Sequence, residues 1–497
     1  MDVRDVVITR DKINLICPYP IWDFYLIEII HEVNEHARLR VEALLEWDSR
    51  EELEDIINDV KESDVIQVII QSEDDSEILF TGVPVNVDVR INGHEGILIL
   101  ECYSGTYYMD IHECSRSFQN VSMQYSDMVE FVVGQYSEGA FKNTGAVGRT
   151  IDRPVIQYKE TDWQFLKRMA SEVGTVVTAD VSSKDAKLWL GIPDKIKSAE
   201  IGLERVLKKK KFESEYQNEH CYYEVSLADE YLKIGDMVDV LGDQVFVTKA
   251  VFKYEKDDGV LRTHYRLEEP PRMKRFGNEG VKGISLEGRV LDVKLDHVKV
   301  HLDVDENQAV SDAFWYPCKA EANNVWYVMP HIGERVSLYI ADMKEIGLCM
   351  TQIRGKEEQM GTPGSLSKPT EKYMLTKWHQ QIALREEDIE WDSVLVKIIL
   401  DEDCIYVDSN DIIEIATEIE LNVGKAEFDY FENGRRRSGR GETKNILLRA
   451  ENLITMQVIE TESVIELDRH ARIHASSKIR QVGGHVLPTP IGFGGGG

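Results

Sequence analysis

The C-terminal part of the chain repeats one simple pattern, and that pattern limits how it can fold. Pairs of apolar residues separated by a single residue recur at intervals of about six to eleven residues over 382–421, and the pattern resumes over 446–475. This spacing predicts short strands joined by tight turns. The pairs are Ile382/Leu384, Ile389/Trp391, Ile398/Leu400, Ile405/Val407, Ile413/Ile415, Ile419/Leu421, Ile446/Leu448, Ile454/Met456, Ile465/Leu467 and Ile473/Ala475.

Strands of this kind do not form a stable core by themselves. Each one is short and buries a narrow apolar stripe, so neighbouring chains must cover the rest. If several copies wind together, each strand pairs with a strand of another chain and few edges stay unpaired. We therefore predict a β-helix or β-prism needle over residues 381–497. The alternative is a β-sandwich with irregular strands.

The N-terminal half combines many strands with few helices. We expect a β-rich first domain over residues 1–100, an α/β region over 101–180 and a second β-rich region over 181–275. Within the first domain, apolar residues alternate with polar ones over residues 85–91, ahead of Asn92-Gly93. Alternation followed by this dipeptide predicts a hairpin. The predicted class is mainly β with minor α.

The clearest helix is predicted over residues 161–173. Thr161 and Gln164 have the spacing of a capping box, and Gly174 follows the last turn. Its apolar face, which we expect to pack the helix onto its domain, consists of Trp163, Leu166, Met169, Ala170 and Val173.

A small barrel is predicted over residues 276–356. Prolines and glycines in residues 270–283 indicate a linker before it, and a second linker is predicted over 357–380. Five short strands in this interval favour a barrel of the oligonucleotide/oligosaccharide-binding (OB) type. Its expected packing residues are Trp315, Tyr316 and Pro317.

Two segments resemble a known family. Residues 158–174, YKETDWQFLKRMASEVG, resemble the signature segment of VgrG proteins and of late-control D-type hub proteins of contractile phage tails. Phe314-Trp315-Tyr316-Pro317, followed by MPHIGERVSLYIAD at 329–342, is similar to the small barrel of the same family. The order of the predicted parts along nearly the whole chain also resembles that family.

The resemblance implies a homotrimeric hub and spike of a contractile injection system. Two barrel-like domains per chain, over residues 1–100 and 181–275, would form a pseudo-sixfold ring that docks on the tail tube and baseplate. The trimeric needle would pierce the target cell envelope, and a PAAR-like tip protein or cargo could dock at its end. Phage tail, tailocin, type VI secretion system and extracellular injection particle all stay open as the setting.

The sequence predicts a structural protein rather than an enzyme. No nucleophile-elbow, metalloprotease or phosphate-loop motif occurs, and no catalytic residue is assigned. The linker at 357–380 is too short for the lysozyme-like domain that some phage relatives insert there. The two alternatives are a hub with an unrecognised cell-wall hydrolase activity and a free-standing trimeric adhesin.

Net charge and targeting signals limit the expected binding partners and the expected location of the protein. The formal net charge of −31 argues against nucleic acid as the main partner, since phosphate binding needs a basic surface. The N-terminus shows no apolar signal-peptide core. We therefore expect synthesis in the bacterial cytoplasm, assembly into a baseplate and delivery outside the cell on firing.

Candidate ligand and contact residues complete the sequence predictions. No cofactor or metal is predicted; the candidate metal ligands near the tip are His470, His474 and His485, which lack a His-x-His pair. The seven cysteines form no CxxC pair and are expected to be reduced. Lys208–Lys211 is expected to form a solvated face or loop, and Arg435–Arg437, among glycines, a loop that interrupts the needle.

Overall fold

The computed structural model divides into two units, residues 1–360 and 361–497. The structure describes residues 7–474 except 48, 72–75, 93–94, 194–197, 201–205, 214–217, 228–230, 241, 270–275, 319–328, 342–346, 353–370, 377, 379, 394, 402–404, 410–424, 433–434, 443–453, 459–462 and 468–470.

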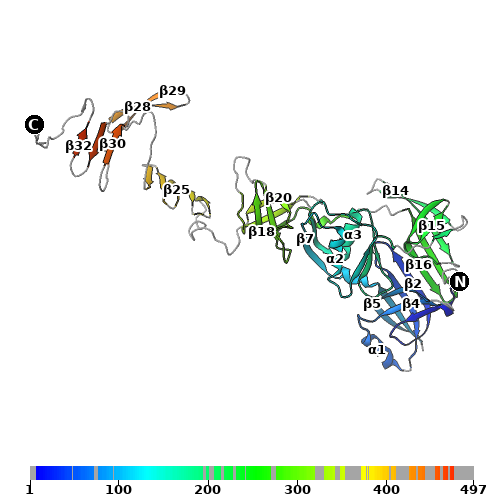
Figure 1. The fold of residues 1–497 in the computed structure, drawn as a ribbon. Coiled ribbons are helices and arrows are strands. Elements are labelled where there is room, and N and C mark those ends of the chain that lie inside the picture. Colours follow the sequence, from blue (N-terminus) through cyan, green and yellow to red (C-terminus); the bar gives the residue numbers. More distant parts are fainter. Residues whose placement is uncertain are drawn as a thin grey trace, which may run out of the picture. The chain divides into compact units, whose positions relative to one another are not determined.

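A 12-stranded sheet forms the largest part of the first unit (Figure 1). Its main path has the order β1-β4-β5-β6-β3-β2-β16-β17-β14-β13, and β15 joins β12 to β16. The strands are β1 (Ile13–Ile16), β2 (Ile21–Glu32), β3 (Arg38–Leu45), β4 (Ile66–Gln71), β5 (Ser76–Asn92), β6 (Glu95–Tyr103), β12 (Ser198–Glu200), β13 (Val206–Glu213), β14 (Asn218–Leu227), β15 (Met237–Val240), β16 (Asp243–Glu255) and β17 (Leu261–Glu268).

The pairing of β2 with β16 changes the predicted division of this region. The two strands run antiparallel from Lys249 opposite Glu32 to Glu255 opposite Leu26. One hydrophobic core, which includes Ile27 and Phe252, spans both halves. Residues 1–100 and 181–275, predicted as separate domains, therefore share one sheet and one core, because strands far apart in sequence pair edge to edge. Helix α1 (Arg50–Asp59) and the short helix η2 (Arg10–Lys12) accompany the first half.

An α/β region with its own core lies between the two halves in sequence. Its elements are η3 (Gly105–Asp110), β7 (Glu113–Phe118), α2 (Tyr125–Val133), β8 (Ala140–Asn143), β9 (Val155–Thr161), α3 (Asp162–Glu172), β10 (Val177–Ala179) and β11 (Lys187–Leu190). The predicted capping box begins α3: the Gln164 amide donates to Thr161 Oγ1 at 3.2 Å, and the Thr161 amide donates to the Gln164 side chain at 3.3 Å. Gly174 follows the helix with φ of +76°, which favours glycine.

A five-stranded sheet with a third core ends the first unit. Its order is β20-β19-β18-β21-β22. After η5 (Glu279–Val281) come β18 (Ser285–Lys294), β19 (His297–Leu302), β20 (Trp315–Pro317), β21 (Arg335–Ile340) and β22 (Gly347–Gln352). The edge strands β20 and β22 contact each other, as a small barrel requires. The assignment to the OB type stays a prediction.

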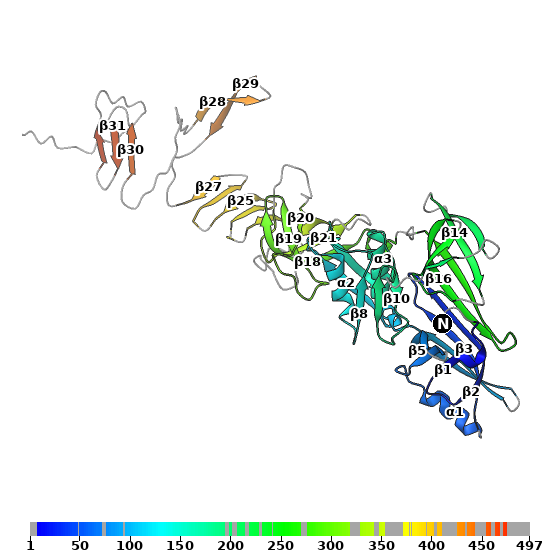
Figure 2. The ribbon, with the colours of Figure 1, turned by 45° about the vertical axis from the view of Figure 1, so that its right-hand side comes forward.

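The second unit contains short antiparallel strands. β23 (Lys372–Leu375), β24 (Gln381–Leu384), β25 (Asp388–Asp392), β26 (Lys397–Asp401) and β27 (Ile405–Asp408) pair in sequence order. β28 (Lys425–Glu432) and β29 (Arg435–Glu442) form a hairpin, and β30 (Ile454–Val458), β31 (Ser463–Leu467) and β32 (Ala471–His474) form a three-stranded sheet. Figure 2 shows these three groups in sequence order.

Three predictions need correction here. β23 lies inside the linker predicted at 357–380, and Arg435–Arg437 lies in strand β29 rather than in a loop. The described strands of this unit pair within one chain, whereas the sequence predicts pairing between chains. A tight turn brings consecutive strands together at little entropic cost, which favours pairing inside the chain.

Candidate functional site

One face of the β23–β27 sheet is almost wholly apolar. Directly opposed residues in paired strands share a face, and so do residues two apart in one strand. The register therefore gathers the predicted apolar pairs of residues 382–407 onto one face. One row across the sheet is Met374, Ile382, Trp391, Ile398 and Val407, and the next is Lys372, Leu384, Ile389, Leu400 and Ile405.

The side chains of this apolar face remain accessible within the chain. Trp391 is 47% exposed and Ile405 is 70% exposed. Ile398 and Leu400, on the central strand β26, are half-buried. A contiguous apolar surface of this kind marks an interaction site in a soluble protein.

On the opposite face of the same sheet, a buried carboxylate pairs with two basic side chains. Glu390 is buried there and pairs with Arg385 at 3.2 Å and with Lys397 at 2.9 Å. The hydrogen bond from Arg385, helped by Lys397, holds the pKa of Glu390 below its ordinary value. The sheet thus buries a carboxylate on one side and exposes tryptophan and isoleucine on the other, which is the reverse of a sheet that covers its own core.

Polar contacts also connect the small five-stranded sheet of β18–β22 to the α/β region. We call this contact the joint. The Ser117 amide and hydroxyl donate to the two carboxylate oxygens of Asp305 at 2.6 and 2.5 Å. Gln119 donates to the Val300 carbonyl at 3.1 Å and accepts from the Phe314 amide at 3.2 Å. Burial raises the pKa of Asp305 above its ordinary value.

Strand β9 contributes to both cores of this joint. Val155 belongs to the core of the α/β region, while the adjacent residue Ile156 belongs to the core of the small sheet. Arg168 of α3 donates to the Ile156 carbonyl at 2.9 Å and forms a buried ion pair with Glu160 at 2.9 Å. The two parts therefore share a strand and form one connected body.

The linker that connects β17 of the large sheet to β18 of the small sheet is also held in place. The Phe276 amide donates to Ser171 Oγ at 3.1 Å, and Asn278 donates to the Tyr158 carbonyl at 2.9 Å. Residues 276–278 of the predicted linker therefore lie against α3 and β9.

The structure places the predicted packing residues as follows. Trp163, Leu166 and Met169 are buried in the core of the α/β region, where the His36 ring lies 4.5 Å from the Trp163 ring centroid. Tyr316 is buried in the core of the small sheet, and Trp315 and Pro317 beside it are half-buried.

Among the described residues, no group of three or more His, Cys, Asp or Glu side chains is placed to hold a metal ion. His470 and His485 lie outside the described residues, and His474 ends β32. No helix in the described part of the chain is long and apolar enough to span a membrane.

Sequence reasoning missed the residues of the joint. Ser117 and Asp305 are 188 residues apart, and neither belongs to a motif. Arg168 could have been noticed, because a charged residue on the buried side of a helix must find a partner. Nothing in the sequence identifies Glu160 and the Ile156 carbonyl as that partner.

Comparisons with solved structures show a shared fold. A chain of the Francisella PdpA-VgrG complex in its half-lidded form matches with a TM-score of 0.51 and 9% identity, over 80% of this chain and 87% of that one. The lidless form of the complex matches with a TM-score of 0.50 and 8% identity, over 78% and 94%. The E. coli c3393 protein, described as a type VI secretion component similar to T4 tail proteins gp27 and gp5, has a TM-score of 0.49 and 13% identity, over 69% and 100%.

Sequence comparisons add little. The Alg8 N-terminal domain model matches residues 58–195. That interval begins inside α1 and takes in the whole α/β region, so it does not coincide with a structural unit. No curated protein sequence matches this chain.

Proposed function

We propose that this chain is the hub and spike protein of a contractile injection system. The first unit would dock on the tail tube and baseplate, and residues 381–497 would form the needle, with a PAAR-like protein or cargo at its tip. The shared fold with a chain of the PdpA-VgrG complex supports the hub role. The protein would be made in the cytoplasm and leave the cell on firing.

The apolar face of β23–β27 is the observation that carries the proposal. Three copies of this sheet, each with its apolar face turned toward a common axis, would bury all three faces in a prism. Each side of the prism would then come from one chain. The needle predicted from the sequence therefore becomes a face-to-face trimer, and the charged network around Glu390 lies on its outside.

The joint between the α/β region and the small sheet suits a part that transmits force. A needle driven by a contracting sheath has to move with the hub rather than bend against it. Strand β9, which contributes to both cores, and the hydrogen bonds of Ser117 and Gln119 couple the two parts directly. The work would come from the sheath, so the role needs no catalytic step.

The first test is the mass of the purified protein by light scattering after gel filtration. One chain has a mass of 57.0 kDa, so the expected species has three times that mass and persists in mild denaturant. A monomer would overturn the needle. Zymography against cell walls tests the non-enzymatic role, and clearing would favour a hydrolase.

A further inference from the structure

A cavity of about 470 Å³ lies where the C-terminal end of α3 meets the linker before β18. We call it the α3–linker cavity. Its wall combines basic, acidic and aromatic side chains, whereas a cavity inside a core is apolar throughout. The lining residues that matter most are Arg149, Arg153, Arg168, Tyr125, Glu172 and Phe276.

Two of the three arginines already have acidic partners. Arg168 pairs with Glu160 at 2.9 Å, and Arg153 donates to Glu172 Oε1 at 2.6 Å. The hydroxyl of Tyr125 donates to the other oxygen of Glu172 at 3.2 Å. Burial raises the pKa of this hydroxyl, so it keeps its proton and stays a donor. Both carboxylates are therefore neutralised, and the wall is held in place before a ligand enters.

The third arginine leaves the cavity open to an acid. Arg149 is exposed and forms no ion pair with another residue that the structure describes. Asp152 contacts Arg153 at 3.3 Å, but its side chain is 85% exposed. A pair as exposed as this one is worth little, so an incoming carboxylate can displace Asp152. Thr150, next to Arg149 in the cavity wall, adds a hydroxyl donor.

Phe276 gives the cavity an aromatic wall as well. Its ring is half-buried, and Lys167 Nζ lies 5.8 Å from the ring centroid. Its amide donates to Ser171 Oγ at 3.1 Å, which fixes the residue against α3. A ligand that matches both parts of the wall therefore carries an apolar side chain close to a carboxylate.

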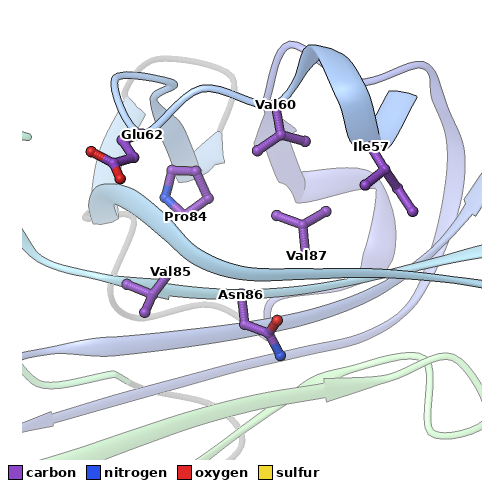
Figure 3. Close-up of a pocket in the computed structure, with 7 residues that line it drawn as sticks. All are labelled: Ile57, Val60, Glu62, Pro84, Val85, Asn86 and Val87. Carbon is purple, nitrogen blue, oxygen red and sulfur yellow. The ribbon is translucent and has the colours of Figure 1, made fainter. Parts of the chain in front are cut away.

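The groove between α1 and strand β5 differs in both size and charge (Figure 3). It has a volume of about 290 Å³, and Figure 3 shows Ile57 and Val60 pointing toward Val87 across it. Among the described residues that line this groove, the one charged side chain belongs to Glu62. The groove therefore offers apolar contact but no cation for a carboxylate, and it provides a control for the cavity.

We propose that the α3–linker cavity binds an acidic peptide segment of a partner protein. One carboxylate would lie between Arg149 and Arg153, since a guanidinium group holds a carboxylate through two parallel hydrogen bonds. A neighbouring apolar side chain would pack on Phe276. The rim residues Arg149, Thr150 and Gly277 are exposed, so the cavity admits a chain, whereas a small molecule is usually enclosed by its site. This docking site goes beyond the proposed function and does not depend on the needle.

Fluorescence anisotropy with the full chain tests this site. The probe is a fluorescein-labelled peptide, Gly-Phe-Glu-Phe-Glu-Gly, and the control peptide has Gln in place of Glu. We expect the acidic peptide to bind, the Gln peptide to bind far more weakly, and added salt to weaken binding. Arg149→Gln should weaken binding about tenfold, the scale of a hydrogen bond to a charged group. Arg90→Gln, at an exposed arginine of β5, is the matched control and should change nothing.

A variant in the α1–β5 groove separates the two surfaces. Val85→Asp adds a charge to that groove and should leave peptide binding unchanged. Binding that is lost in Val85→Asp and kept in Arg149→Gln would assign the peptide to the groove and overturn the proposal.

Three other results would also overturn the proposed site. They are no binding of the acidic peptide, equal binding of the two peptides, and displacement of the acidic peptide by an equal concentration of succinate. The last result would assign the cavity to a small dicarboxylate instead. None of them bears on the mass measured by light scattering, so the proposed hub and spike role is tested separately.

Discussion

The large sheet of the first unit and the β23–β27 sheet of the second place similar alternating sequences in opposite situations. In the first, apolar side chains such as Ile27 and Val41 are fully buried in a core built by the same chain. In the second, Trp391 and Ile389 stay exposed while Glu390 between them is buried. Alternation alone therefore does not say what covers an apolar face. The first unit covers its cores within one chain, whereas the second leaves an apolar face open.

The largest effect is expected from placing a charge on the open apolar face. Trp391→Asp should make the trimer dissociate at concentrations where the parent protein stays assembled. Burial of one large apolar side chain is worth about 1.5–3 kcal/mol, and three copies lose it together. Gel filtration with light scattering at several concentrations measures this.

Tyr406→Asp is the matched control for that variant. Tyr406 is also exposed, but it shares a row and a face with Ile399 and Glu390. It should leave the assembly unchanged. Equal dissociation of both variants would show that the two faces do not differ, and the contrast between the units would fail.

The next largest effect is expected on the stability of the first unit, whose cores are covered by its own chain. Arg168→Met leaves the Glu160 carboxylate buried without its ion-pair partner, which typically costs about 3–5 kcal/mol. Thermal unfolding should show a clear loss of stability of this unit, with the C-terminal assembly little changed. Arg262→Met removes an exposed pair with Asp258 and should change stability far less.

A smaller effect should loosen the joint without unfolding either side of it. Gln119→Ala leaves the Val300 carbonyl and the Phe314 amide without their partner, at a cost of about 1–3 kcal/mol. Hydrogen exchange should speed up near these residues and stay slow in the large sheet. Gln135→Ala, which removes an exposed bond to the Phe131 carbonyl, is the control. Uniform exchange in both variants would argue against a joint.

Local features of the molecule could be predicted from the sequence, and distant pairings could not. The Thr161–Gln164 capping box depends on residues three apart, and the apolar pairs of the C-terminal strands on residues two apart. The pairing of β2 with β16 joins residues more than 200 positions apart, and no local preference encodes it. No local preference encodes the contact between Ser117 and Asp305 either, which are 188 positions apart.

The partner of a predicted apolar face was also beyond sequence reasoning. The pairs at Ile389/Trp391 and Ile398/Leu400 indicate which residues share a face, but pairing inside one chain and pairing between chains use the same alternation. For the same reason, the lysines of β13 and the arginines of β29 gave no sign that they lie in strands, since a charge run at an edge strand looks like a solvated loop.

The smallest effect is a dependence on pH that we expect on only one face of the β23–β27 sheet. The folded pKa of Glu390 lies below its unfolded value, so its ion pairs with Arg385 and Lys397 stabilise the sheet above the unfolded pKa. That contribution, about 1 kcal/mol, disappears as pH falls through the folded pKa. Protection from hydrogen exchange over residues 381–401, taken relative to the intrinsic rate at each pH, should therefore fall as the pH drops through the folded pKa of Glu390. Glu390→Gln should be less protected at neutral pH and should lose most of this pH dependence, because its side chain does not titrate. The two rows on the apolar face contain no carboxylate and no histidine, so the assembly should persist over the same pH range. If acid dissociates the trimer in the parent and in Glu390→Gln alike, the association depends on charged groups and not on the apolar face.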